Sequence, residues 1–123
     1  MSANNVQFFL IMRNQIKLYH WQTGLYSRHK GTDDVVKALD ENIDKYVEVY
    51  MGKYGRPKMN SRTSTLHLKN FNEKNAVAFV KACIRELIEE VPKGLKKTDT
   101  DLVNIRDEML SDLNQLLYLF TLN

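Results

Sequence analysis

The chain has 123 residues, of which 43% are hydrophobic and 27% are charged, and its formal net charge is +3. This length fits one domain with a single core, residues 1–123, and the mild charge alone neither indicates nor excludes nucleic-acid binding. The apolar run from Phe8 to Met12 is far too short for a membrane span and no signal peptide is visible, so we expect a cytoplasmic protein with no membrane partner.

Apolar residues at helical spacing predict four helices, at about residues 5–23, 32–51, 71–92 and 99–121. Only two prolines and five glycines interrupt the chain, which favours an all-α fold. The connections between these helices run short, long, short, and the long connection covers residues 52–70. One long crossover in the middle is typical of ferritin-like four-helix bundles.

The first predicted helix is apolar on two sides. Its faces carry Phe8, Phe9, Met12, Ile16 and Tyr19 on one side, and Leu10, Ile11, Leu18 and Trp21 on the other. A helix that is apolar nearly all round is buried on both sides, but a four-helix monomer of this size covers only one of them. We therefore expect a homo-oligomer, at least a dimer, that forms through the first and second helices.

In the second predicted helix, Asp33 and Asp34 favour the positive N-terminal end, and Gly52 offers a C-terminal stop. The apolar stripe of this helix consists of Val36, Leu39, Ile43, Tyr46, Val47 and Tyr50. Asp44 and Glu48 lie about 120° and 160° from the centre of that stripe, at 100° per residue. These two acids are therefore not expected to point into the core of their own subunit.

The segment 52–70 has no helical pattern and contains Gly55 and Pro57. A stretch of this length is uncommon inside a compact domain unless it has a role. At about 3.3 Å per residue it reaches roughly 60 Å, enough to span a helix of about 30 Å, so we expect a crossover between opposite ends of the bundle. It is also the most basic part of the chain, with Lys53, Arg56, Lys58, Arg62 and Lys69.

Capping-box spacing predicts where the last two helices begin. Asn70 with Glu73 has this spacing at the start of the third helix, and Thr98 with Asp101 has it at the start of the fourth. The third helix carries the single cysteine, Cys83, on its apolar stripe. This position predicts a buried, reduced thiol in the core.

Two histidines and two acids in the first half of the chain form a candidate metal site. His20 is followed by Trp21, His29 comes next, and Asp44 and Glu48 stand four residues apart on a predicted helix. Side chains at i and i+4 share one stripe of a helix, about 6 Å apart, which is close enough to bracket a metal. Imidazoles combined with carboxylates suit iron, manganese or zinc.

The pattern His20-Trp21, His29, Asp44-x-x-x-Glu48 resembles the iron-site motif of the Dps family, the mini-ferritins. This resemblance implies that His20 and His29 come from one subunit and that Asp44 and Glu48 come from its two-fold mate, at a ferroxidase centre in the dimer interface. The interval between the two histidines is shorter than is usual in that family. Two interpretations stay open: a tighter hairpin between the first two helices, or one histidine that lies outside the site.

The resemblance implies a protein that binds iron, oxidises Fe(II) as a ferroxidase, and serves oxidative protection or iron storage. Three alternatives come from the residues. The first is a metal site inside one subunit that uses Asp107 or Asp112, although the Glu-x-x-His signature is missing. The second is a ferritin-like helical oligomer without catalysis, acting as a structural or interaction protein. The third is nucleic-acid binding through the basic crossover, a function that the charge distribution as a whole does not favour.

Overall fold

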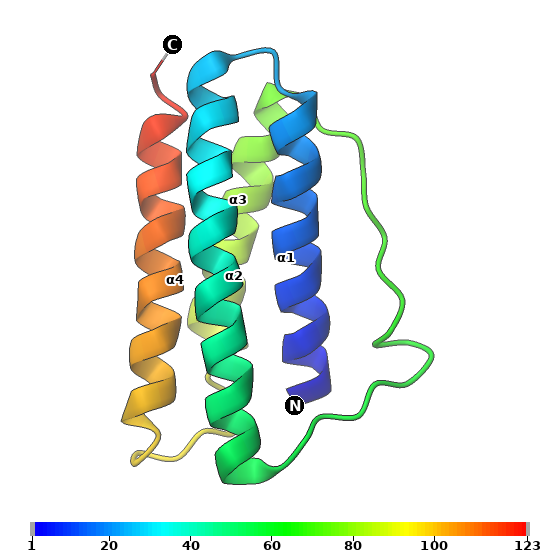
Figure 1. The fold of residues 1–123 in the computed structure, drawn as a ribbon, viewed down its shortest axis with the longest axis vertical. Coiled ribbons are helices and arrows are strands. Elements are labelled where there is room, and N and C mark those ends of the chain that lie inside the picture. The colour runs from blue at the N-terminus through cyan, green and yellow to red at the C-terminus, as the bar shows by residue number, and fades with distance from the viewer. Residues whose placement is uncertain (1, 123) are drawn as a thin grey trace.

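The computed structural model describes residues 2–122 as four α-helices packed side by side in one bundle (Figure 1). They are α1 (Ser2–Gln22), α2 (Tyr26–Tyr54), α3 (Glu73–Glu89) and α4 (Thr100–Leu119). These residues contain no strand, so the predicted all-α four-helix bundle is confirmed. Among the four helices, none combines the length and the apolar character needed to cross a lipid bilayer.

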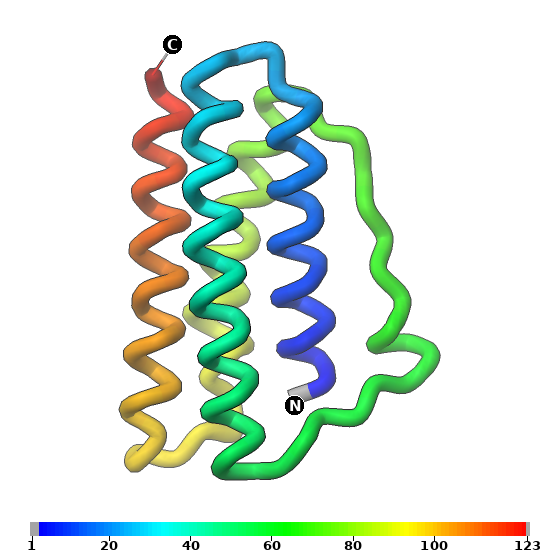
Figure 2. The backbone as a smooth tube through the Cα atoms, in the orientation of Figure 1, coloured from blue at the N-terminus to red at the C-terminus, as the bar shows by residue number. Residues whose placement is uncertain are grey.

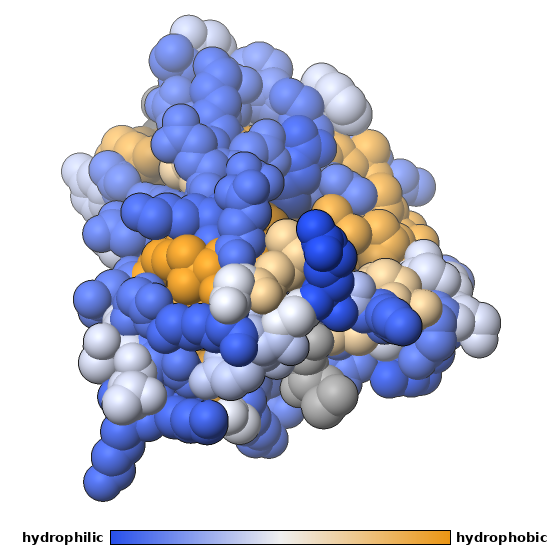
Figure 3. All heavy atoms as spheres, turned by 60° about the horizontal axis from the view of Figure 1, so that its bottom comes forward, coloured by the Kyte–Doolittle hydropathy of each residue, from blue (hydrophilic) through white to orange (hydrophobic). Residues whose placement is uncertain are grey.

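The apolar stripes of all four helices meet along the axis of the bundle. The core includes Phe9, Met12, Ile16, Tyr19, Leu39, Tyr46, Leu87, Leu102, Met109, Leu113 and Leu116. Cys83 belongs to this core as a free thiol, as expected, and burial raises its pKa. Hydrophilic side chains cover most of the surface seen in Figure 3, and hydrophobic side chains gather there in a few patches.

A long connection, residues 55–72, leads from the end of α2 to the start of α3 and follows the length of α1 (Figure 2). Three glutamines of α1 hold it in place through their side-chain amides: Gln7, Gln15 and Gln22. The central one, Gln15, is buried and pairs with both backbone groups of Lys69, donating to the carbonyl at 2.7 Å and accepting from the N–H at 2.9 Å. The crossover is therefore fixed to the bundle.

The first turns of α2 lie outside the predicted helix. We expected this helix to begin at residue 32, but it begins at Tyr26. The residue before it, Leu25, makes no side-chain cap, so the usual start signal is missing from the sequence. Gly31 lies inside the helix, where an added Cβ would meet Leu119 Cδ1 at 3.2 Å. Glycine at this position lets α2 approach α4 closely.

The other helix ends also differ from the prediction by a few residues. α2 continues past Gly52 and stops at Gly55, whose φ of 89° suits glycine. The crossover therefore begins at residue 55. At the start of α3, the cap is Asn72 and its partner is Asn75, which donates its N–H to the Asn72 side chain at 2.7 Å. The predicted cap Asn70 lies outside the helix, and the reciprocal bond of the capping box is donated by the Asn72 N–H to Asn75 Oδ1.

Asp99 takes the position at the start of α4 that the sequence assigned to Thr98. Its carboxylate is buried and joins this end of α4 to the end of α2. It accepts hydrogen bonds from the Tyr54 hydroxyl at 2.5 Å, from Lys53 Nζ at 3.0 Å and from the Lys96 N–H at 2.8 Å. The bond from Tyr54 is the main reason why the pKa of Asp99 lies at about 2.

We expect Asp99→Asn to lower the stability of the protein at pH 7 and to have almost no effect near pH 2. The pKa of Asp99 in the folded state is below that of an ordinary aspartate, so the ionised group stabilises the fold above about pH 4. This contribution is lost as the pH falls through about 2. Urea midpoints of the variant and the original protein should therefore converge between about pH 4 and about pH 2. Midpoints separated by a constant gap over this range would contradict the prediction.

Candidate metal site

His20 and His29 come together where α1 turns into α2. His20 lies in the last turn of α1 and His29 in the first turns of α2, and only residues 23–25 separate the two helices. The two imidazole rings are stacked, with centroids 4.0 Å apart and an interplanar angle of 17°. The connection between the two helices is therefore a tight hairpin, and it places the two histidines side by side.

Each histidine is held by the backbone of the other helix. His20 Nδ1 lies 2.7 Å from the carbonyl oxygen of His29, and His29 Nδ1 lies 2.9 Å from the carbonyl oxygen of His20. A carbonyl oxygen only accepts, so each Nδ1 carries a hydrogen and donates it. In the neutral form of each ring, Nε2 then keeps its lone pair, which is the arrangement found in metal-binding histidines.

Both Nε2 atoms are without a hydrogen-bond partner among residues 2–122, although the two rings differ in exposure. His20 is 6% exposed and His29 lies at the surface. Thr32 supports the inner ring, with its hydroxyl 3.0 Å from His20 Nδ1, and donates to the carbonyl of Arg28 at 2.6 Å. The pair is therefore oriented by three fixed oxygens and presents two nitrogens that are free to bind a ligand.

A buried arginine that the sequence analysis missed anchors this turn to the other helices. Arg28 Nη1 donates to the Tyr19 hydroxyl at 3.0 Å and to the Glu73 carbonyl at 2.7 Å, and Nη2 donates to the Phe120 carbonyl at 3.1 Å. The Tyr19 hydroxyl donates to Glu73 Oε1 at 2.6 Å, and burial together with this bond raises the pKa of Tyr19. All four helices therefore meet below the histidine pair.

Asp44 and Glu48 lie far from the histidines of the same chain. Both acids are exposed on α2. At 1.5 Å per residue, Asp44 is displaced from His29 by about 22 Å along the helix. Within the described part of the chain, no three His, Cys, Asp or Glu residues are grouped closely enough to hold a metal ion. One chain alone therefore brings the two histidines together and leaves the two acids apart from them.

The site inside one subunit that the sequence offered as an alternative is also not formed. Asp107 pairs with Arg106 at 2.9 Å, and Arg106 also donates to the carbonyl of Leu87. Asp112 accepts a bond from Asn42 at 3.4 Å, and its pKa is raised by burial. Within the described residues, Asp107 therefore takes part in an ion pair and Asp112 in a hydrogen bond.

The four candidate ligands share one side of the molecule, which we call the outer α1–α2 face. On α2, His29, Asp44 and Glu48 fall within an arc of about 100° at 100° per residue. On α1, the exposed members of this face include Leu10 and Trp21, which are 39% and 67% exposed. The second apolar side predicted for α1 is thus exposed at these two residues, while Ile11 and Leu18 are half-buried.

A shallow hollow of about 320 Å³ lies at the acid end of the outer α1–α2 face. Its lining includes Leu10, Asn14, Ile43 and Asp44. An ion pair crosses beside it from α1 to α2, with Arg13 Nε 2.8 Å from Asp40 Oδ1. Both partners are partly exposed, so this pair orients the two helices more than it stabilises them.

One comparison with known proteins gives a match. The model of DUF5856, a family of unknown function, matches residues 20–120, a range that includes all four candidate ligands. No curated protein and no solved structure matches the chain.

Proposed function

Because this chain belongs to the DUF5856 family, whose function is unknown, we propose its function from its own side chains. We propose that two copies pair through their outer α1–α2 faces, bind Fe(II) between them and oxidise it. His20 and His29 of one copy and Asp44 and Glu48 of the other supply the ligands. The resulting activity is that of a Dps-like ferroxidase, which removes Fe(II) together with its oxidant.

The stacked histidine pair is the observation that carries this proposal. Its two Nδ1–H groups are each bound to a backbone carbonyl at 2.7 and 2.9 Å. Bonds of this kind set the tautomer and orientation of metal-binding histidines. Neither Nε2 has a hydrogen-bond partner among residues 2–122, so the stacked pair leaves two imidazole nitrogens available to a ligand.

The placement of the acids supports a site shared by two copies. A two-fold axis perpendicular to α2, midway between His29 and the two acids, would exchange the two ends of the face. Such an axis lies level with Lys37 and within one helical turn of Asp40. It would bring the histidine pair of one copy opposite Asp44 and Glu48 of the other. The exposed Leu10 and Trp21 would then be covered in the same interface.

The donor set suits iron oxidation. Imidazole nitrogens and carboxylate oxygens together bind Fe(II), and carboxylates also accept the harder Fe(III) product. Each Fe(II) ion gives up one electron, so two Fe(II) ions reduce one hydrogen peroxide molecule, which takes up two protons and leaves as two waters. The protein holds the ions close together and keeps positions open for the oxidant.

We expect the double variant Asp44→Ala, Glu48→Ala to lose iron binding and at least about 90% of Fe(II) oxidation, while its melting temperature stays nearly unchanged. Both acids are exposed and away from the core, and exposed substitutions change stability by about 0.5 kcal/mol or less. The measurement is bound iron by elemental analysis and the initial rate of Fe(II) oxidation by peroxide, with unfolding followed by circular dichroism.

A matched control is the double variant Glu89→Ala, Glu108→Ala, which removes two exposed acids from α3 and α4, away from the outer α1–α2 face. It should bind and oxidise iron as the original protein does. Equal activity in both double variants would refute the proposed ligands. If the original protein forms a dimer but neither binds iron nor oxidises Fe(II), the result would instead favour a helical oligomer without catalysis.

A further inference from the structure

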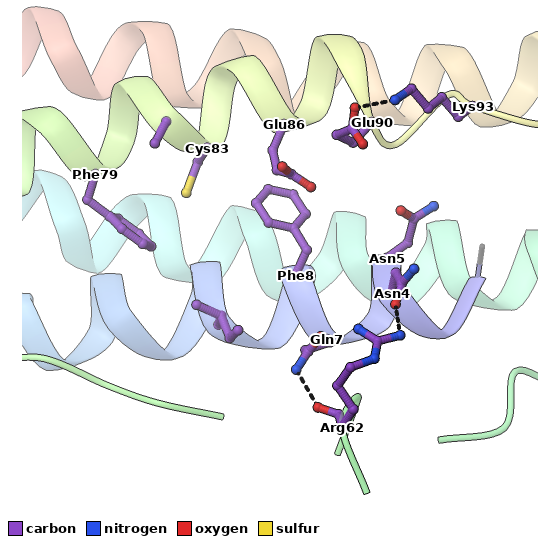
Figure 4. Close-up of a pocket in the computed structure, with 12 residues that line it drawn as sticks. Asn4, Asn5, Gln7, Phe8, Arg62, Phe79, Cys83, Glu86, Glu90 and Lys93 are labelled. Carbon is purple, nitrogen blue, oxygen red and sulfur yellow. Dashed lines mark hydrogen bonds and ion pairs between the residues drawn. The ribbon is translucent and has the colours of Figure 1, made fainter. Parts of the chain in front are cut away.

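A second surface feature, a groove between α1 and α3, is separate from the histidine pair (Figure 4). Its volume is about 630 Å³, within the range of pockets that bind small organic molecules. The crossover contributes Arg62 to its edge. The groove exists because α1 and α3 each pack more closely on other helices than on one another.

The floor of the groove is apolar and partly aromatic. Phe8 reaches up from α1 and Phe79 reaches down from α3, and both rings are half-buried (Figure 4). Ile11 and the buried Cys83 complete this floor. Such a surface suits the hydrocarbon body of a ligand, and its rings also offer faces to a cation.

Four charged side chains line the groove, two cations and two acids. Lys93 Nζ lies 2.6 Å from Glu90 Oε2, and Arg62 Nη2 donates to Asn4 Oδ1 at 3.0 Å. Glu86 points from α3 into the groove beside the Phe8 ring (Figure 4). Its carboxylate has neither a hydrogen bond nor an ion pair with any residue from 2 to 122. Burial, followed by the nearby Glu90, raises its pKa.

We propose that this groove binds a small amphiphilic organic cation, an amine carried on an apolar body. Its ammonium group would pair with Glu86, and its apolar body would lie against Phe8 and Phe79. Glu86 is the charged group beside the aromatic floor, whereas Arg62 stands at the edge and donates to Asn4, so the floor suits a cation better than an anion. The apolar floor favours an amine with a hydrocarbon body over an inorganic cation, because a metal ion would find only one carboxylate without an ion pair and would not use the apolar surface.

The test uses three probes with the same body: 4-phenylbutylamine, which is a cation at pH 7, neutral 4-phenylbutanol, and anionic 4-phenylbutyrate. Binding is measured by calorimetry and mapped by amide chemical shifts on the full chain. We expect the amine to bind with a dissociation constant of about 1 mM or tighter and the other two at least about tenfold more weakly. The shifted amides should lie on α1 and α3, around Phe8 and Phe79.

Two variants and a control locate the site. Glu86→Gln should weaken amine binding about tenfold and leave the alcohol unaffected. Glu89→Gln removes an exposed charge from the same helix outside the groove and should change nothing. Ala82→Phe places a ring in the groove and should weaken the binding of all three probes. The proposal is overturned if the amine fails to saturate below about 10 mM, binds Glu86→Gln unchanged, or shifts amides elsewhere.

Discussion

Replacing Arg28 with methionine should lower the free energy of unfolding by about 3 kcal/mol and the melting temperature by roughly 10 °C. Methionine has a similar length and fills the space, so the loss reports the guanidinium and not a cavity. The guanidinium donates to the Tyr19 hydroxyl and to the carbonyls of Glu73 and Phe120, and lies 4.4 Å from the centre of the Phe120 ring. Chemical unfolding followed by circular dichroism measures the change.

The size of this effect follows from the hydrogen-bond acceptors that lose their donor when Arg28 is replaced. Without it, the buried Phe120 carbonyl loses its donor and the part-buried Glu73 carbonyl loses a second one, and a buried group left unsatisfied costs about 1–3 kcal/mol. The charged Glu73 keeps the bond from Tyr19 at 2.6 Å but loses the nearby positive charge. The buried Nε of Arg28 has no hydrogen-bond partner among the described residues, so removing that atom recovers a small part of the cost.

Two comparisons make this prediction specific. Arg85→Met changes an exposed arginine of α3 and should alter stability by less than about 0.5 kcal/mol. Arg28→Lys keeps the positive charge but not the planar fork that reaches three acceptors, so it should lose most of the same stability. Full stability in Arg28→Lys would mean that charge alone matters at this position.

Why the sequence did not reveal Arg28 is clear from the start of α2. The helical period correctly placed Val36 and Leu39 in the core. Extending that stripe backwards by one and two turns leads to Thr32 and then to Arg28, both of which are buried. The missing cap at Leu25 made the helix look shorter than it is, so Arg28 was left outside it. When a helix begins without a side-chain cap, the sequence gives no signal that the residues of its first turns are helical.

The candidate site, like the start of α2, was only partly predictable from the sequence. The family resemblance named His20 and His29 as ligands of one subunit, and their short interval left open whether one of them lies outside the site. The structure stacks their rings. Helical phase was enough to predict that Asp44 and Glu48 avoid the core. The bonds from each Nδ1 to the opposite backbone depend on the shape of the turn, which no side-chain pattern encodes. The partner that would join the two halves lies outside a single chain.

Mixing two inactive variants should restore iron oxidation if the site is shared between copies. One variant carries His20→Ala and His29→Ala, and the other carries Asp44→Ala and Glu48→Ala. Each alone should be inactive, because every interface site lacks either both nitrogens or both carboxylates. After the two are unfolded together in equal amounts and refolded, half of the dimers should contain one copy of each, and each mixed dimer should contain one complete site. We expect about a quarter of the original rate.

Recovery of activity distinguishes a site shared by two copies from a site within one chain. If all four ligands had to come from one chain, no mixture would contain an intact set and the rate would stay at zero. The two-fold arrangement predicts recovery because His20 and His29 of one copy meet the intact acids of the other across the outer α1–α2 face. His29 and the acids lie about 22 Å or more apart along α2, too far to share a metal within one copy. If the recovered rate of Fe(II) oxidation also rises with the fraction of mixed dimers, the oxidation takes place at the interface between the two copies.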